Sequence, residues 1–175
     1  MTPVSEQIPA GYSRHFRSSP LTDPWEPLYS KAQNGSILLA LRNRQAHCNS
    51  RGFAHGGLIS ALADNAMGLS LHETLRATQH VEPSGLVTIS LSLDFLGVAK
   101  IDQWLEVVPR VLRAGGSVGF VDCLVRLTIS RSRAATQRSA SFALPRIDEC
   151  DWPNFRPYPR KRESSSNDNV RRRHS

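Results

Sequence analysis

One continuous stretch, residues 48–68, constrains the fold of this chain more than any other. Its first part holds Asn49, Gly52 and the triplet His55-Gly56-Gly57, residue types that are typical of a tight turn. The following segment, Leu58 to Leu75, contains strong helix formers and no proline. The sequence therefore predicts a long helix entered through a glycine-rich turn. The free N–H groups of its first turn and the positive end of its dipole would favour an anion or a polarised carbonyl.

The predicted helix has two faces of different composition. One face is small or polar and consists of Gly57, Ser60, Ala61, Asp64 and Gly68, while the apolar face consists of Leu58, Leu62, Ala66 and Leu69. Asp64 is the only formally charged residue between Leu58 and Leu71. An Asp on a helix is more often simply solvated. A carboxylate in the middle of a mostly buried helix, however, needs a partner or a function.

These residues also carry a family resemblance. The motif Asn49-x-x-Gly52-x-x-His55-Gly56-Gly57, followed by Leu62-Ala63-Asp64, resembles the signature of the hotdog-fold acyl-CoA thioesterases, specifically their PaaI-like branch. The similarity covers about residues 19–144, including the run from Gly85 to Ala99, and Val98 stands where such sequences often have proline. The resemblance implies an α+β hotdog fold, in which a curved antiparallel sheet of roughly five to six strands wraps one long central helix.

The rest of the chain fits one domain between two polar segments. Residues 1–26 contain four prolines and predict an irregular arm, so that order begins near Pro27. Residues 27–147 form the predicted domain, and residues 148–175, rich in proline, arginine and serine, predict a disordered tail. Apolar runs and turn signals predict strands at 28–31, 36–43, 86–96, 103–112, 118–129 and 134–144.

Two details of these elements are expected from local pattern. Asn34-Gly35 predicts a tight hairpin between the first two strands. Alternating Ala and Ser in residues 134–144 indicate a strand at a sheet edge. Residues 72–83 are expected to form a loop after the helix.

Charge and cysteine content limit the classes of partner and compartment. The net charge is +7, of which residues 156–175 supply +5, so the body of the chain lacks the broad basic character that nucleic-acid binding favours. The three cysteines form no metal-ligand spacing, and their odd number and the absence of a leading apolar segment predict a cytoplasmic protein. No apolar run approaches the length of a membrane span. His72 has no second histidine at the spacing that a zinc hydrolase requires.

The resemblance implies thioester hydrolysis and assigns roles to five residues. The Gly57 N–H would polarise the acyl carbonyl, and Asp64 would either activate water or attack the carbonyl itself. Asn49 would orient the water or the carbonyl, and Thr88 would hold Asp64 or the water. His55 would either fix the turn through a hydrogen bond or contact the thioester, and the sequence favours neither role.

The site is expected to need two copies of the chain. Seven residues separate Gly57 from Asp64, which places them about 10 Å apart along one helix, too far to serve one carbonyl easily. Two antiparallel helices across a twofold axis would bring Gly57 of one copy to Asp64 of the other, and the resemblance implies a homodimer or a dimer of dimers. No cofactor is implied, because coenzyme A is part of the substrate. Its phosphates suggest basic partners, and the candidates in or near turns are Arg51, Lys100, Arg113, Arg131 and Arg133.

Two other functions are compatible with the predicted fold. A non-catalytic acyl-CoA-binding regulator could use the same pocket, but the complete set of Asn49, Gly57 and Asp64 favours catalysis. A hotdog hydratase or dehydratase would place a histidine and an acid for proton transfer at the substrate's α and β carbons, whereas here His55 lies at the helix entrance. The acyl group itself stays open.

Overall fold

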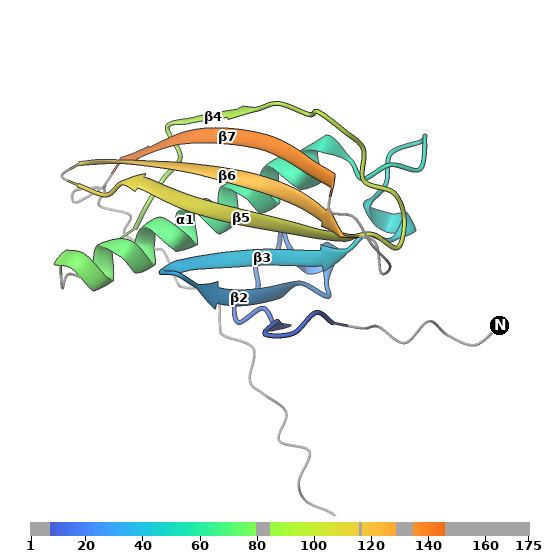
Figure 1. The fold of residues 1–175 in the computed structure, drawn as a ribbon, viewed down its shortest axis with the longest axis horizontal. Helices are drawn as coiled ribbons and strands as arrows, with labels where there is room; N and C mark the ends of the chain where they lie inside the picture. Colours follow the sequence, from blue (N-terminus) through green and yellow to red (C-terminus); the bar gives the residue numbers. More distant parts are fainter. Residues whose placement is uncertain (1–7, 80–84, 116, 129–134, 146–175) are drawn as a thin grey trace, which may run out of the picture.

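The computed structural model describes residues 8–79, 85–115, 117–128 and 135–145. One α-helix, α1 (Gly56–Gln79), runs along one face of a curved antiparallel sheet (Figure 1). Within the described residues the sheet has seven strands in the order β1-β2-β3-β5-β6-β7-β4. Their bounds are β1 Ser13–Arg14, β2 Tyr29–Gln33, β3 Ser36–Arg42, β4 Ser90–Leu93, β5 Trp104–Arg113, β6 Val118–Thr128 and β7 Ala135–Pro145. The α+β class, with one helix against the sheet, is as predicted.

The core lies between α1 and the inner face of the sheet. The four residues of the predicted apolar helix face, Leu58, Leu62, Ala66 and Leu69, are all buried. They face a sheet whose strands alternate inward and outward, as in β6, where Val121, Cys123, Val125 and Leu127 point into the core. α1 packs mainly against β3 and β5. The predicted face of small residues stays partly open to solvent, from Gly57 through Asp64 to Gly68.

The helix is longer than expected. Residues 72–83 were predicted to form a loop, but α1 continues to Gln79. Leu75 is buried, Thr74 and Thr78 donate hydrogen bonds to carbonyls one turn earlier, and Arg76 pairs with Glu73 at 2.8 Å. The buried Leu75 and the ion pair between Glu73 and Arg76 therefore support the helix beyond the apolar run.

The order of the last strands also differs from the prediction. The strand at 134–144 was expected at an edge, but β7 lies between β6 and β4 and pairs with both. The edge is formed by β4, which spans only Ser90–Leu93 rather than the predicted 86–96. Large aliphatic and aromatic side chains around it are exposed, and we call this surface the apolar edge: Val87, Ile89, Leu91, Phe95, Leu96 and Val98.

The N-terminal segment is more ordered than expected, because regular structure begins before Pro27. β1 pairs with β2, and a 3-10 helix, η1 (Asp23–Trp25), follows. Tyr12 packs edge-on against Trp104 with ring centroids 5.3 Å apart, and its hydroxyl donates a hydrogen bond to the Glu106 carboxylate. Burial, helped by that carboxylate, raises the pKa of Tyr12, so the phenol stays protonated and remains a donor.

Candidate active site

The turn before the helix is closed by one side chain. Asn49 Oδ1 accepts hydrogen bonds from the backbone N–H groups of Arg51 at 2.9 Å and Phe53 at 3.3 Å. The Asn49 N–H donates to the Phe53 carbonyl at 2.8 Å. Gly52 has φ +77°, a conformation that favours glycine. The side-chain oxygen of Asn49 therefore shapes the loop as a hydrogen-bond acceptor, while the NH₂ group of the same side chain is a hydrogen-bond donor.

His55 caps the helix that follows the turn. Its N–H donates to the His47 carbonyl at 2.9 Å, and its side-chain Nδ1 accepts the Gly57 N–H at 3.0 Å. A Cβ at Gly57 would lie 3.0 Å from that same Nδ1, so glycine lets the imidazole lie close to the backbone. In this structure the N–H expected to face a carbonyl thus already has an acceptor. Of the two contacts expected for His55, the structure contains the hydrogen bond that fixes the turn.

Asp64 lies in the middle of α1 on the partly open stripe. Thr88, from the segment that leads into β4, donates a hydrogen bond from Oγ1 to Asp64 Oδ1 at 2.5 Å. The segment then runs back along the helix, since Phe95 lies beside Gly56, where an added Cβ would meet its ring at 3.3 Å. Within the described residues, Asp64 is therefore held by a neutral hydroxyl rather than by a cationic side chain. Its second oxygen can accept a further hydrogen bond.

The expected phosphate-binding residues separate into three groups. Arg51 is exposed in the turn, and an isolated bridge between Phe53 and Lys100 places the exposed Lys100 beside that turn. Arg113 lies instead at the other end of the molecule, where it lines a groove of about 900 Å³ together with Ala77 and other residues near the helix C-terminus. Arg131 and Arg133 lie outside the described residues. Among the described residues there is no group of three His, Cys, Asp or Glu side chains that could hold a metal ion.

Comparison with known proteins places this arrangement in a family. The family described as "Thioesterase superfamily" matches residues 51–131. A Pseudomonas aeruginosa protein, whose name assigns it provisionally to the esterases, is 37% identical over 139 residues, which are 79% of this chain and 98% of that protein. The chain belongs to the thioesterase superfamily. Human acyl-coenzyme A thioesterase 13 is 25% identical over 89 residues, which cover 51% of this chain and 59% of the human protein.

Solved structures of the superfamily share the fold of this chain. A thioesterase family protein from Silicibacter pomeroyi superimposes with a TM-score of 0.63 at 15% identity, covering 73% of this chain and 88% of that one. The Escherichia coli PaaI protein gives 0.57 at 17% identity over 69% and 79%. A Streptococcus mutans protein, solved bound to acetyl-CoA, gives 0.55 at 23% identity over 66% and 85%. The hotdog fold and the thioester hydrolase class are thereby confirmed.

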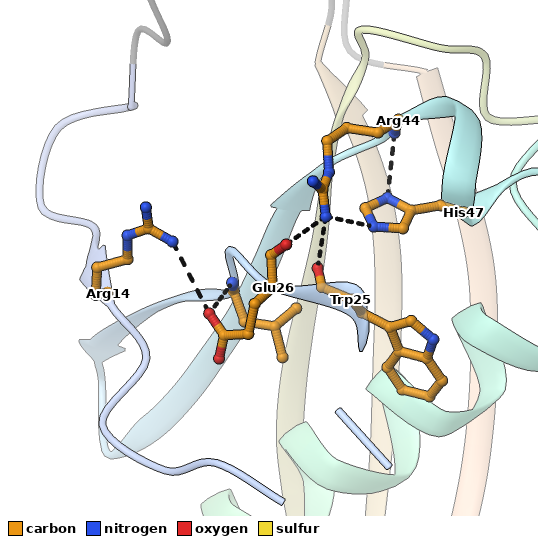
Figure 2. A network of polar contacts seen from close by, with 6 residues as sticks. Arg14, Trp25, Glu26, Arg44 and His47 are labelled. Carbon is orange, nitrogen blue, oxygen red and sulfur yellow. Dashed lines mark hydrogen bonds and ion pairs between the residues drawn. The ribbon is translucent and has the colours of Figure 1, made fainter. Parts of the chain in front are cut away.

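The sequence reading of this thioesterase missed two residues next to the turn. Arg44 precedes the 3-10 helix η2 (Gln45–His47) and His47 is its last residue; the two side chains contact each other, and the Arg44 guanidinium contacts the carbonyls of Trp25 and Glu26 (Figure 2). No motif marks them, because their partners lie 18 and 19 residues earlier in the chain.

Within the described residues of this thioesterase, no helix is both long enough and apolar enough to cross a membrane.

Proposed function

We propose that this chain is an acyl-CoA thioesterase that hydrolyses an acyl- or aryl-CoA thioester to the free acid and coenzyme A. The observation that carries the proposal is Asp64, a carboxylate in the middle of an otherwise uncharged helix segment, on its open stripe, with Thr88 Oγ1 at 2.5 Å. The relatives that are named as acyl-CoA thioesterases, and the similar fold solved with acetyl-CoA, support the substrate class.

Gly57 is the proposed donor to the thioester carbonyl. Its N–H lies in the first turn of α1, where the helix dipole favours a developing oxyanion. Because His55 Nδ1 accepts this N–H in the structure, the carbonyl oxygen must replace the imidazole as acceptor. His55 is exposed, so its ring can rotate toward solvent without leaving a cavity. Binding would then exchange one acceptor for another at the same donor.

Asp64 is the proposed base or nucleophile. As a base, its second oxygen takes a proton from water while the water oxygen bonds to the carbonyl carbon, and the proton passes to the sulfur of the leaving thiolate. As a nucleophile, it bonds to the carbonyl carbon while the C–S bond breaks and the thiolate of coenzyme A leaves, and water then hydrolyses the resulting anhydride to the free acid and the Asp64 carboxylate. Thr88 orients the carboxylate in either route. Asn49 is the proposed donor of a further hydrogen bond, from its NH₂ group, to water or to the carbonyl.

A second copy of the chain would complete the site. Gly57 and Asp64 are about 10 Å apart along the helix, and the stripe between them carries the small residues Ser60 and Ala61. This stripe lets a second helix approach closely in antiparallel order. The apolar edge beside it exposes large side chains, such as Ile89 at 57% and Leu96 at 66%, next to an unpaired strand edge. We therefore propose a homodimer, or a dimer of dimers, with composite sites.

Coenzyme A would enter beside the turn. Arg51 and Lys100 are both exposed at that end of the helix, where they could contact phosphate oxygens. Arg113 lies at the other end of the helix, so within one copy it cannot contact the same coenzyme A molecule as Arg51 and Lys100. No cofactor is required by this chemistry.

The decisive experiment is release of free thiol from a panel of acyl-CoA thioesters. Asp64→Asn retains the shape of the side chain but can neither accept a proton as a carboxylate does nor attack, so turnover should fall by about three orders of magnitude. Glu73→Gln, a matched change of another acid on the same helix, should leave turnover unchanged. Near wild-type turnover in a folded Asp64→Asn protein would remove Asp64 from the mechanism. Binding of acyl-CoA without turnover by the wild type would favour a non-catalytic acyl-CoA-binding regulator.

A further inference from the structure

Arg44 and His47 form a reciprocal cap around η2. The Arg44 N–H donates to His47 Nδ1 at 3.1 Å (Figure 2). The His47 N–H donates to the Arg44 carbonyl at 2.9 Å. The imidazole is buried, with 3% of its residue surface exposed. A buried ring with hydrogen bonds in fixed directions sets the path of the backbone that leaves η2.

The Arg44 guanidinium ties this cap to the N-terminal segment. Its Nη2 donates to the carbonyl oxygens of Trp25, at 3.3 Å, and Glu26, and lies 3.2 Å from His47 Nε2. Both carbonyls lie outside residues 51–131, the part that matches the superfamily. Arg44 and His47 also precede residue 51, so the whole contact lies before the matched region.

The cap connects directly to the helix entrance. The His47 carbonyl accepts the His55 N–H at 2.9 Å, and His55 Nδ1 accepts the Gly57 N–H at 3.0 Å. We propose that Arg44 and His47 are positioning residues that fix the helix entrance of the thioesterase site only while the His47 imidazole is neutral. This inference rests on the proposed function for its effect on turnover, but its effect on the backbone is independent of it.

The hydrogen bonds explain why the neutral ring is required. A neutral imidazole has one acceptor nitrogen; Nδ1 accepts the Arg44 N–H, while Nε2 faces the Trp25 carbonyl and lies 3.2 Å from Arg44 Nη2, which is itself a donor. Protonation would set a second N–H against the Arg44 N–H and place a positive charge beside the guanidinium. From η1 the Trp25 carbonyl faces the ring, whereas the Glu26 carboxylate points toward the Leu28 N–H, at 3.0 Å, and toward Arg14, at 3.8 Å (Figure 2).

The direction of the pH dependence follows from burial and charge. Burial, reinforced by Arg44, lowers the pKa of His47 below its ordinary value of 6.5. Below pH 6.5 the unfolded chain therefore binds a proton that the folded chain resists, so the stability from this cap is complete above pH 6.5 and declines as the pH falls. In the folded protein the helix entrance is lost only when the ring itself is protonated, so turnover should fall at a lower pH than the one at which stability begins to decline.

Two substitutions at His47 separate the role of the acceptor from that of the proton. His47→Asn places an oxygen near the position of Nδ1 and cannot be protonated, whereas His47→Leu removes both nitrogens. We expect His47→Asn to match the wild-type kcat at about pH 8 and to lose less of it toward about pH 5. His47→Leu should lower kcat by about tenfold throughout with little change in KM, because the misplaced N–H acts on the transition state. Arg44→Met should resemble His47→Leu, and Arg14→Met, a matched loss of an exposed guanidinium near Glu26, should have no effect.

Hydrogen exchange of the His55 and Gly57 amides tests the same proposal without turnover. The protection of both amides against exchange, corrected for the intrinsic pH dependence of exchange, should decrease below pH 6.5 in the wild type but not in His47→Asn. Identical acid profiles of these two proteins in exchange would overturn the proposal, whether or not His47→Leu folds. If exchange follows the prediction while the wild type hydrolyses no thioester, the proposed function fails and the positioning role stands. If exchange and turnover both follow it, both are supported.

Discussion

The hydrogen bond between Thr88 and Asp64 gives a prediction whose size follows from the structure. Thr88→Val keeps the branched shape of the side chain and removes the hydroxyl that donates to Asp64 Oδ1 at 2.5 Å. The carboxylate then loses the described contact that fixes its direction. It should still face the open stripe, so the chemistry should slow rather than stop.

The expected size comes from the strength of a hydrogen bond to a charged group. Such bonds contribute about 1.5 to 3 kcal/mol. Thr88 is exposed and Asp64 is only partly buried, so water can replace much of the interaction and the lower end applies. A loss of about 1.5 kcal/mol in the transition state corresponds to roughly a tenfold fall in kcat. Because the bond orients the base or nucleophile rather than the substrate, KM should change little.

The assay is steady-state release of free thiol, with Thr88→Ser as the matched control. Serine retains the hydroxyl and should keep kcat within about threefold of wild type, since only a methyl group is lost. Turnover of Thr88→Val equal to that of Thr88→Ser would show that the hydroxyl does not orient Asp64 during catalysis. A fall of about a thousandfold would instead make Thr88 an essential donor to the substrate or the water.

Two further predictions concern the helix entrance and the edge of the sheet. His55→Ala should lower the free energy of unfolding by about 1 kcal/mol, because the Gly57 N–H loses its cap, and lower kcat by less than about tenfold; a loss of about a hundredfold would show direct contact with the thioester. Ile89→Lys should produce an inactive monomer in size-exclusion chromatography, whereas Leu112→Lys, at a similarly exposed residue on β5, should leave the dimer and its activity intact. An active Ile89→Lys dimer would exclude the apolar edge as the interface.

Features specified by neighbouring residues could be predicted from the sequence. The glycine-rich entrance, the buried helix face and the β2–β3 hairpin at Asn34-Gly35 follow from spacing and turn chemistry. The position of β7 could not be predicted in this way, because whether a strand lies at an edge depends on which distant strand pairs with it, and the β4 residues that pair with β7 lie about 50 positions earlier in the chain.

The candidate site was predictable to a similar extent. The family resemblance assigned Thr88 a role with Asp64, and the structure places their oxygens in contact. The acceptor for the Gly57 N–H was not foreseen, since an exposed histidine one residue before a helix can point to solvent or fold back equally well. Arg44 and His47 carry no pattern, because their role comes from carbonyls of the N-terminal segment.

The composite site is the central claim, and complementation between inactive variants tests it most directly. Gly57→Pro removes the N–H proposed to polarise the carbonyl, and Asp64→Asn removes the proposed base or nucleophile. In a mixed dimer, one site would combine both changes and the other would keep both native residues, one from each copy. Unfolding the two proteins together and refolding them makes about half of all dimers mixed, so activity should return to roughly a quarter of the wild-type value. If both variants refold and exchange subunits but the mixture stays as inactive as its components, each site lies within one chain.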